Sequence, residues 1–145
     1  LIQHRSVLKN ILGLCDWVYP IVCTPATENW IGDLELEAEI YSAVVGQEVT
    51  SDDLLHIAER VFVLERLIMI TEGIMSDNLP PRYFNKSNYW TGSQPIDKEK
   101  WNELLKIYYR LRGWNERGIP TMSKLKELGL DKIIPKSILE ELGIP

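Results

Sequence analysis

The sequence is short of the features that mark several common classes of protein. Two cysteines cannot form a disulfide framework, and together they cannot fill a four-ligand metal site. No apolar run reaches the roughly 18 residues that a membrane span needs. Basic residues are outnumbered, with 16 Lys and Arg against 21 Asp and Glu, and this net charge of -5 argues against a nucleic-acid partner.

Common catalytic motifs are missing as well. There is no Gly-rich phosphate loop, no nucleophile elbow and no pair of histidines at metal-binding spacing. The 145 residues are 45% hydrophobic and 26% charged, which is typical of a folded globular protein. The sequence begins at Leu1 without a methionine or a secretory leader, so we expect a cytoplasmic piece of a longer protein.

Apolar residues recur at helical spacing through most of the sequence. We therefore predict an all-α fold, an irregular multi-helix domain with a long central buried helix and extended loops rich in aromatic residues and proline. Four of the predicted helices cover residues 1–12, 34–45, 51–75 and 136–142. Another helix is predicted to begin after a cap at Asp97 and to end at Gly113. A further one is predicted to begin after a cap at Thr121 or Ser123 and to end at Gly129. Residues 17–25 are predicted to be extended and buried, and residues 77–95 to form a long ordered loop.

The predicted helix over 51–75 is apolar around most of its circumference. Its polar residues form one narrow stripe that includes Asp52, Glu59 and Arg66, which are seven apart. A helix with so narrow a polar face is expected at the centre of its domain. We expect Arg60 and Arg66 to form ion pairs with Glu59 or Glu65 on the helix surface, and pairing with phosphate groups of a cofactor is the alternative.

Cys15 follows the first predicted helix, just after Gly13. Backbone groups at a helix end are free to bind a ligand, and a thiolate placed there suits a soft metal or an iron–sulfur cluster. A buried apolar cysteine behind a glycine is the alternative. Cys23, in an apolar segment flanked by prolines, fits the second interpretation better.

Four stretches, in order, resemble the tungsten-containing aldehyde:ferredoxin oxidoreductase family. The first is Gly-Leu-Cys-Asp at 13–16, which is similar to the family's cofactor motif Asp-x-x-Gly-Leu-Cys-Asp. The others are Ile-Ala-Glu-Arg at 57–60 with Leu-Glu-Arg at 64–66, Asp-Asn-Leu-Pro-Pro-Arg at 77–82, and the run from Tyr109 to Thr121 with Leu-Gly-Leu at 128–130. The resemblance identifies residues 1–145 as a C-terminal helical domain fragment of such a protein.

The resemblance also implies cofactors and site residues. Family members hold a bis-pterin tungsten (or molybdenum) centre and a nearby 4Fe-4S cluster, and they pass electrons from aldehydes to ferredoxin. By this likeness Cys15 is the fourth ligand of the cluster, and Gly13, Leu14 and Asp16 lie along one pterin. The first motif position, an Asp in the family, is Asn10 here, whose amide oxygen can still accept a hydrogen bond.

The likeness implies that no catalytic acid or base lies in this chain and that the fragment alone is inactive. The other domains of the same chain are expected partners, together with ferredoxin and, as an open question, a second copy. Two alternatives stay open. One is the catalytic subunit of an ATP-independent benzoyl-CoA reductase of the same family, and the other is a non-enzymatic helical module that binds a partner protein.

Overall fold

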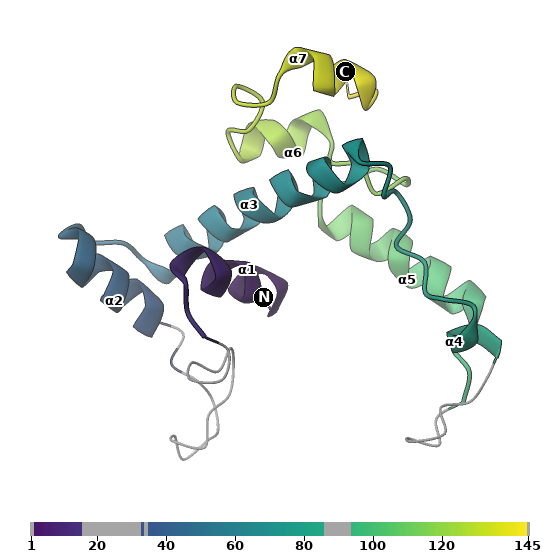
Figure 1. Ribbon diagram of the computed structural model, residues 1–145, viewed down its shortest axis with the longest axis horizontal. Coiled ribbons are helices and arrows are strands. Elements are labelled where there is room, and N and C mark those ends of the chain that lie inside the picture. The colour runs from purple at the N-terminus through teal and green to yellow at the C-terminus, as the bar shows by residue number, and fades with distance from the viewer. Residues whose placement is uncertain (1, 16–32, 34, 86–93, 145) are drawn as a thin grey trace. The chain divides into compact units, whose positions relative to one another are not determined.

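The computed structural model describes residues 2–15, 33, 35–85 and 94–144, and these residues are helical without a strand (Figure 1). The predicted all-α class is therefore confirmed for this part of the chain. Its helices are α1 (Ile2–Leu12), α2 (Leu36–Val45), α3 (Ser51–Thr71), α4 (Arg82–Asn85), α5 (Lys98–Leu111), α6 (Met122–Glu127) and α7 (Lys136–Glu141). In the same residues, no helix is long and apolar enough to cross a membrane.

Several helix ends lie where the sequence predicts them. Asp97 caps α5, since its side chain accepts hydrogen bonds from the backbone N–H groups of Glu99 and Lys100. Thr121, one of the two predicted alternatives, caps α6 through the N–H of Lys124. The helix α2 ends at Gly46, as predicted.

One predicted helix end is wrong, and one predicted loop contains a helix. The helix α3 ends at Thr71 and not near Met75, because the N–H of Ile74 bonds back to the carbonyl of Met69 and closes the helix. The loop predicted over 77–95 contains the short helix α4. The extended segment predicted over 17–25 and the middle of that loop lie outside the described residues.

The chain divides into two compact units, Leu1–Glu65 and Arg66–Pro145, and the boundary falls within α3. The first unit packs α1 and α2 against the beginning of α3 (Figure 1). Its core is a cluster of buried small and branched side chains: Val7, Leu8, Ala38, Leu54 and Ala58. The hydroxyl of Ser42 links α2 to the next segment, because it donates to the carbonyl of Val49 and accepts from its N–H.

The second unit has its own core, formed by the end of α3, the end of α5 and the C-terminal helices. Its buried side chains include Leu67, Ile70, Tyr109, Trp114, Ile119, Leu125, Leu128, Leu130 and Leu139. The segment between α5 and α6 is a tight turn, in which Trp114 and Pro120 form an isolated antiparallel bridge.

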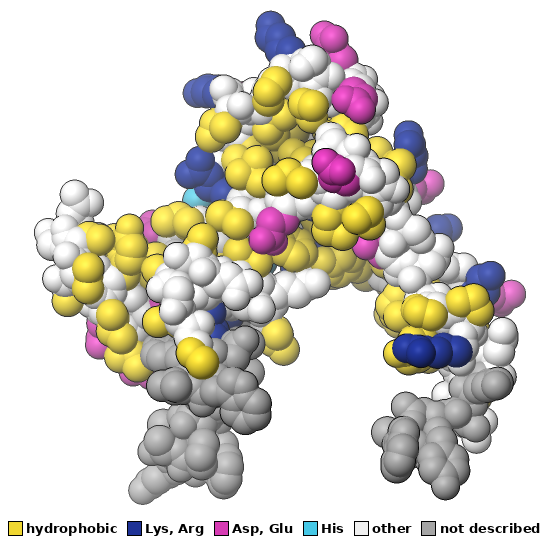
Figure 2. Space-filling model, in the orientation of Figure 1, with side chains coloured by type: hydrophobic (Ala, Val, Ile, Leu, Met, Phe, Trp, Pro, Cys, Tyr) yellow, Lys and Arg dark blue, Asp and Glu magenta, His cyan; other side chains and the backbone are white. Residues whose placement is uncertain are grey.

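The residues of α3 that are exposed differ from those predicted to be exposed. Arg66 is buried, with 5% of its surface exposed, whereas Ile57 and Ile68 are exposed. Hydrophobic side chains also reach the surface elsewhere (Figure 2). Leu104 and Leu111 on α5 are exposed. The prediction that Arg66 faces solvent and pairs with Glu59 or Glu65 is therefore wrong. Arg66 pairs with a different carboxylate, as described below.

Candidate functional site

The predicted cofactor loop begins at the C-terminal end of α1. Gly13 has a left-handed backbone with φ of 69°, a conformation that other residues adopt at a steric cost. Its N–H donates to the carbonyl of Asn10 at 3.2 Å, and the N–H of Leu14 donates to the carbonyl of Lys9 at 2.9 Å. This pair of bonds is a Schellman motif, which satisfies two carbonyls that a helix end otherwise leaves open.

The face of this loop is open. Asn10, Gly13 and Cys15 are exposed, and Leu14 is half-buried. A Cβ atom added at Gly13 would meet nothing within 4 Å, so the backbone here can approach a bulky group. The Cys15 thiol is free and exposed, which is the condition that a metal-binding thiolate needs.

The loop thus brings together four of the five predicted site residues: Asn10, Gly13, Leu14 and Cys15. The fifth, Asp16, lies outside the described residues, and so does Cys23. Within the described part of the chain, no group of three or more His, Cys, Asp or Glu side chains is arranged to hold a metal ion. Cys15 therefore fits a cluster only as one ligand among others that come from elsewhere.

A partly buried ionic network lies in the second unit, with Arg66 5% and Asp77 31% exposed. The guanidinium of Arg66 binds Asp77 through two parallel hydrogen bonds, Nη1 to Oδ1 at 2.9 Å and Nη2 to Oδ2 at 2.8 Å. Its Nε donates to the carbonyl of Gly118 at 2.9 Å. The hydroxyl of Tyr109 donates to Oδ2 of the same Asp77. Bidentate pairing with additional hydrogen bonds is what makes a buried arginine tolerable.

Gly118 is shaped by this network. It has φ of 73°, and a Cβ added there would lie 2.5 Å from Nη2 of Arg66 and 2.8 Å from Cζ of Tyr109. The Arg66 guanidinium also lies over the Trp114 ring, 5.2 Å from its centroid. A glycine at position 118 thus leaves the space that the 113–120 turn needs to pack against Arg66.

Tyr109 has an altered acidity. Burial raises the pKa of its hydroxyl to about 12, and the hydrogen bond to Asp77 and the charge of that carboxylate act in the same direction, while Arg66 opposes them. The tyrosine therefore keeps its proton at neutral pH and serves as a hydrogen-bond donor. The network has the geometry of a structural brace between α3, α5 and the turn after α5.

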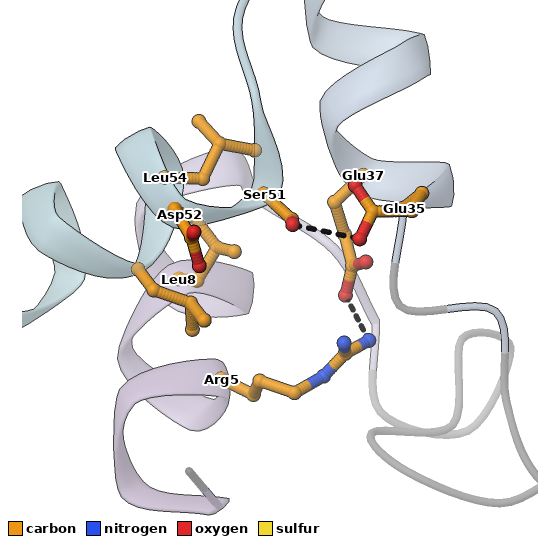
Figure 3. A pocket seen from close by; sticks show the side chains of 8 residues that line it. Arg5, Leu8, Glu35, Glu37, Ser51, Asp52 and Leu54 are labelled. Carbon is orange, nitrogen blue, oxygen red and sulfur yellow. Dashed lines mark hydrogen bonds and ion pairs between the residues drawn. The ribbon is translucent and has the colours of Figure 1, made fainter.

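The first unit contains a cavity of about 190 Å³ beside its core (Figure 3). Its polar lining consists of Arg5 from α1, Glu35 and Glu37 at the start of α2, and Ser51 and Asp52 at the start of α3. Arg5 and Glu37 form a buried ion pair through Nη2 and Oε1, with 3% and 2% exposed surface. The hydroxyl of Ser51 donates to Oε1 of Glu35 at 2.8 Å.

Sequence reasoning did not find either arginine site. Arg5 stands two residues before Val7 on a short amphipathic pattern, where a cation is normally assigned to the surface. The partners Glu37 and Asp77 lie 32 and 11 residues away along the chain. For Arg66 one signal was present, because Asp77 opens one of the family-like stretches and Gly118 lies in another.

Comparisons with known proteins agree on one family. A family model described as aldehyde ferredoxin oxidoreductase, domains 2 and 3, matches residues 1–130. A tungsten-containing aldehyde ferredoxin oxidoreductase of Pyrococcus horikoshii is 34% identical over 99 residues, which are 66% of this chain and 16% of that protein. The protein of the same name from Thermococcus kodakarensis is 30% identical over 136 residues, 92% of this chain and 21% of that protein.

A solved structure resembles the fold. It is the active site complex of benzoyl coenzyme A reductase with 1,5-dienoyl-CoA, with a TM-score of 0.73 and 24% identity. The match covers 95% of this chain and 19% of that one. The chain thus spans 16–21% of the length of the curated relatives described above and a similar share of this structural neighbour.

Proposed function

Because this chain belongs to the aldehyde ferredoxin oxidoreductase family, we propose that it supplies one ligand of a 4Fe-4S cluster and part of a pterin site in a tungsten or molybdenum oxidoreductase. The whole protein would oxidise aldehydes to carboxylic acids and pass the electrons through the cluster to ferredoxin. When bound, the bis-pterin metal centre supplies the redox chemistry, and the protein supplies ligation and orientation.

The observation that carries this proposal is the exposed Cys15 thiol directly after the closed end of α1. The two hydrogen bonds of the Schellman motif hold Gly13 and Leu14 in place, so the cysteine leaves the helix in a defined direction. Cys15 would be the residue of this chain that holds the cluster, and it would do so as a thiolate. A cluster needs four such ligands, so three must come from other parts of the protein.

The neighbouring residues would bind the pterin mainly through the backbone. The open space at the Cβ position of Gly13 supports a close approach of a ring. Asn10, exposed one turn before the loop, offers an amide oxygen to an amino group of the pterin. Leu14 and Asp16 complete the proposed contact.

The proposal is tested by two cysteine variants of the full-length protein. Cys15→Ala should remove the cluster or convert it to a form with fewer irons, because one of its four ligands is lost. Cys23→Ala is the matched control and should keep the cluster, since Cys23 is assigned a packing role. Iron content and the EPR signal of the reduced cluster measure both effects. A full cluster and normal electron transfer to ferredoxin in Cys15→Ala would contradict the proposal.

The 145-residue chain by itself gives a second measurement. Anaerobic reconstitution with iron and sulfide should leave no stoichiometric iron on it, because one matching thiolate cannot hold a cluster. Four irons per chain, lost on mutation of either Cys15 or Cys23, would show that the cluster is held within this chain and not shared with other domains.

Asn10 supports a second candidate function. In this alternative the protein reduces an aromatic ring, as a benzoyl-CoA reductase. The first position of the cofactor motif departs from the Asp of the aldehyde-oxidising family members. Assays of the full-length protein separate the two functions. Aldehyde-dependent reduction of ferredoxin supports the first, and oxidation of a dienoyl-CoA without activity on aldehydes supports the second.

A further inference from the structure

The helix α5 carries three large apolar side chains that reach the surface on one side. Leu104, Ile107 and Leu111 are 61%, 42% and 79% exposed. Tyr109 is buried in the core of the second unit, and at 3.6 residues per turn it lies on a different side of the helix from these three. Single exposed apolar residues are common, but a continuous apolar side of a helix marks a surface that another element covers.

The spacing of these residues indicates that the covering element is a helix. They lie three and four residues apart, which is the spacing of a heptad, with Leu104 and Leu111 at a positions and Ile107 at a d position. Lys100 occupies the preceding d position and is also exposed. Its methylene stem can cover an apolar neighbour while its ammonium group stays in water. These four residues form one stripe, the α5 stripe, over about three helical turns.

The charged residues beside the α5 stripe indicate which helix covers it. Glu103 and Arg110 each precede an a position, so both occupy g positions on the same edge of the stripe. Both side chains are exposed, and within the described residues neither forms an ion pair. Charges at g positions determine which helices pair and in which direction. A helix with an acid at one g position and a base at the next is complementary to a second copy of itself.

A second copy fits the apolar residues when the two helices run antiparallel. In that arrangement, the register that packs Leu104 against Ile107 of the second copy also packs Lys100 against Leu111. Two-fold symmetry repeats both contacts, so every position of one stripe meets a position of the other. Antiparallel helices also bring the positive end of each macrodipole next to the negative end of the other.

The same register brings the charges together. Glu103 of one copy would lie beside Arg110 of the other, and the symmetry gives this contact twice. A parallel pair would instead place each g position next to an e position of the second copy, and the e position that Glu103 would meet is Tyr108. The charges therefore favour the antiparallel pair over the parallel one.

We propose that the α5 stripe binds a second copy of this chain, with the two α5 helices antiparallel and Glu103 of each copy paired with Arg110 of the other. A helix of 14 residues is about 21 Å long. Two helices of that length bury less than the roughly 1,200–2,000 Å² of a stable protein interface, so the dimer is weak and depends on chain concentration. The pairing is independent of the cofactor role proposed for Cys15.

Sedimentation equilibrium of the 145-residue chain tests the surface. The chain should show a reversible monomer–dimer equilibrium in the presence of a reductant, which prevents a disulfide between exposed Cys15 thiols. Leu104→Gln should weaken dimerisation by about tenfold or more, because each copy loses an apolar contact. Ile133→Gln is the matched control, since Ile133 is 59% exposed in the same unit but lies outside α5, and it should change the dissociation constant by less than about twofold.

Two results of this experiment would overturn the proposal. One is a chain that stays folded and monomeric at every concentration. The other is a dimer that Leu104→Gln and Ile133→Gln weaken equally, because such a dimer would form through a different surface.

Charge variants test the antiparallel register. Glu103→Arg and Arg110→Glu should each weaken dimerisation by about fivefold, because each places like charges side by side at both contacts. An equal mixture of the two variants restores opposite charges at both contacts, so a mixed dimer as tight as the wild-type dimer is expected. Circular dichroism checks that both variants keep their helices.

The mixture also separates a second copy from the competing occupant of this face, a further domain of a longer protein. That occupant is relevant because the chain spans 16–21% of the curated relatives described above. If the α5 stripe served only such a domain, the charges on two copies of α5 would not be coupled. Mixing the variants would then give no tighter association than either variant alone, and this result would overturn the proposal.

Discussion

Arg5 in the first unit and Arg66 in the second are both buried and both meet a carboxylate, yet they are satisfied to different extents. Arg66 makes a bidentate pair with Asp77, its Nε reaches the Gly118 carbonyl, and Tyr109 adds a further bond to the same carboxylate. Arg5 reaches Glu37 through one nitrogen, and both residues keep an unpartnered polar atom beside a cavity.

This contrast indicates what each site is suited to do. Removing a charge from water has a large penalty, which is offset only when the surrounding hydrogen bonds are complete. The Arg66 network meets this condition with groups of its own unit, so it functions as a brace. The Arg5 pair does not meet it, because Arg5 Nε and Glu37 Oε2 have no hydrogen-bond partner.

The largest expected effect comes from replacing each pair as a whole by apolar residues. Arg66→Met with Asp77→Leu should lower the stability of the second unit by about 4 kcal/mol, because the Gly118 carbonyl and the Tyr109 hydroxyl both lose their hydrogen-bond partners, at about 1–3 kcal/mol each. Arg5→Met with Glu37→Leu should be neutral or stabilising by about 1 kcal/mol, since no other group in the described part of the chain bonds to the side chains of that pair.

Amide hydrogen exchange measures the two units separately, through Leu125 in the second unit and Ala58 in the first. Equal losses of stability in the two double variants would remove the distinction between a completed and an incomplete pair.

A smaller loss is expected at Gly118. Gly118→Ala places a methyl group against Arg66 and Tyr109 in a left-handed backbone, so it should lower the stability of the second unit by about 2–4 kcal/mol. Gly129→Ala is the matched control, because Gly129 has φ of 64° and nothing within 4 Å of its Cβ position, and about 1–2 kcal/mol is expected there. Chemical denaturation measures both. If the two variants lost the same stability, Gly118 would not be needed for packing against the arginine.

The smallest effect concerns the Tyr109 hydroxyl. Tyr109→Phe should lower the stability of the second unit by about 1 kcal/mol at neutral pH, since Asp77 keeps both bonds to Arg66. The folded pKa is about 12 against 10.0 for an ordinary tyrosine, so the unfolded chain loses this proton first. The stability that the hydroxyl contributes is present below pH 10 and declines as the pH rises toward 12.

Denaturation curves at several pH values test this dependence. The difference in unfolding free energy between wild type and Tyr109→Phe should shrink between pH 10 and 12. The other tyrosines are common to both proteins, so their titration largely cancels in the difference. A constant difference over this range would contradict the raised pKa of Tyr109.

Local structure was predictable from the sequence where short-range chemistry decides it. Asp97 and Thr121 were expected as helix caps, because a short oxygen-bearing side chain before an apolar helical pattern satisfies the first N–H groups. The turn at Gly13 was expected because glycine commonly ends a helix. The end of α3 was placed about four residues late, because the apolar residues Ile74 and Met75 continue the helical pattern past the hydrogen bonds that close it.

The candidate cofactor loop was predictable as a motif, and its chemistry remains a proposal. Asn10, Gly13, Leu14 and Cys15 are adjacent in sequence, so their proximity in space follows from the helix end alone. The two arginine sites were not predictable in this way. The residues next to a charged side chain in a helical pattern do not indicate whether that side chain is buried. Arg66 was assigned to solvent because its neighbours on the polar stripe are acidic.

The amino-acid sequence therefore specified the helical class, most of the helix ends and a glycine-closed turn before Cys15, whereas the exposure of that cysteine came from the structure. These features depend on contacts within a few residues. The tertiary structure alone decided that Arg66 is buried against Asp77, that Gly118 closes on it, and that Arg5 and Glu37 meet beside a cavity. Burial of a charge depends on partners that are distant in sequence, because only the folded chain brings the acceptor, the glycine turn and the apolar wall to one place.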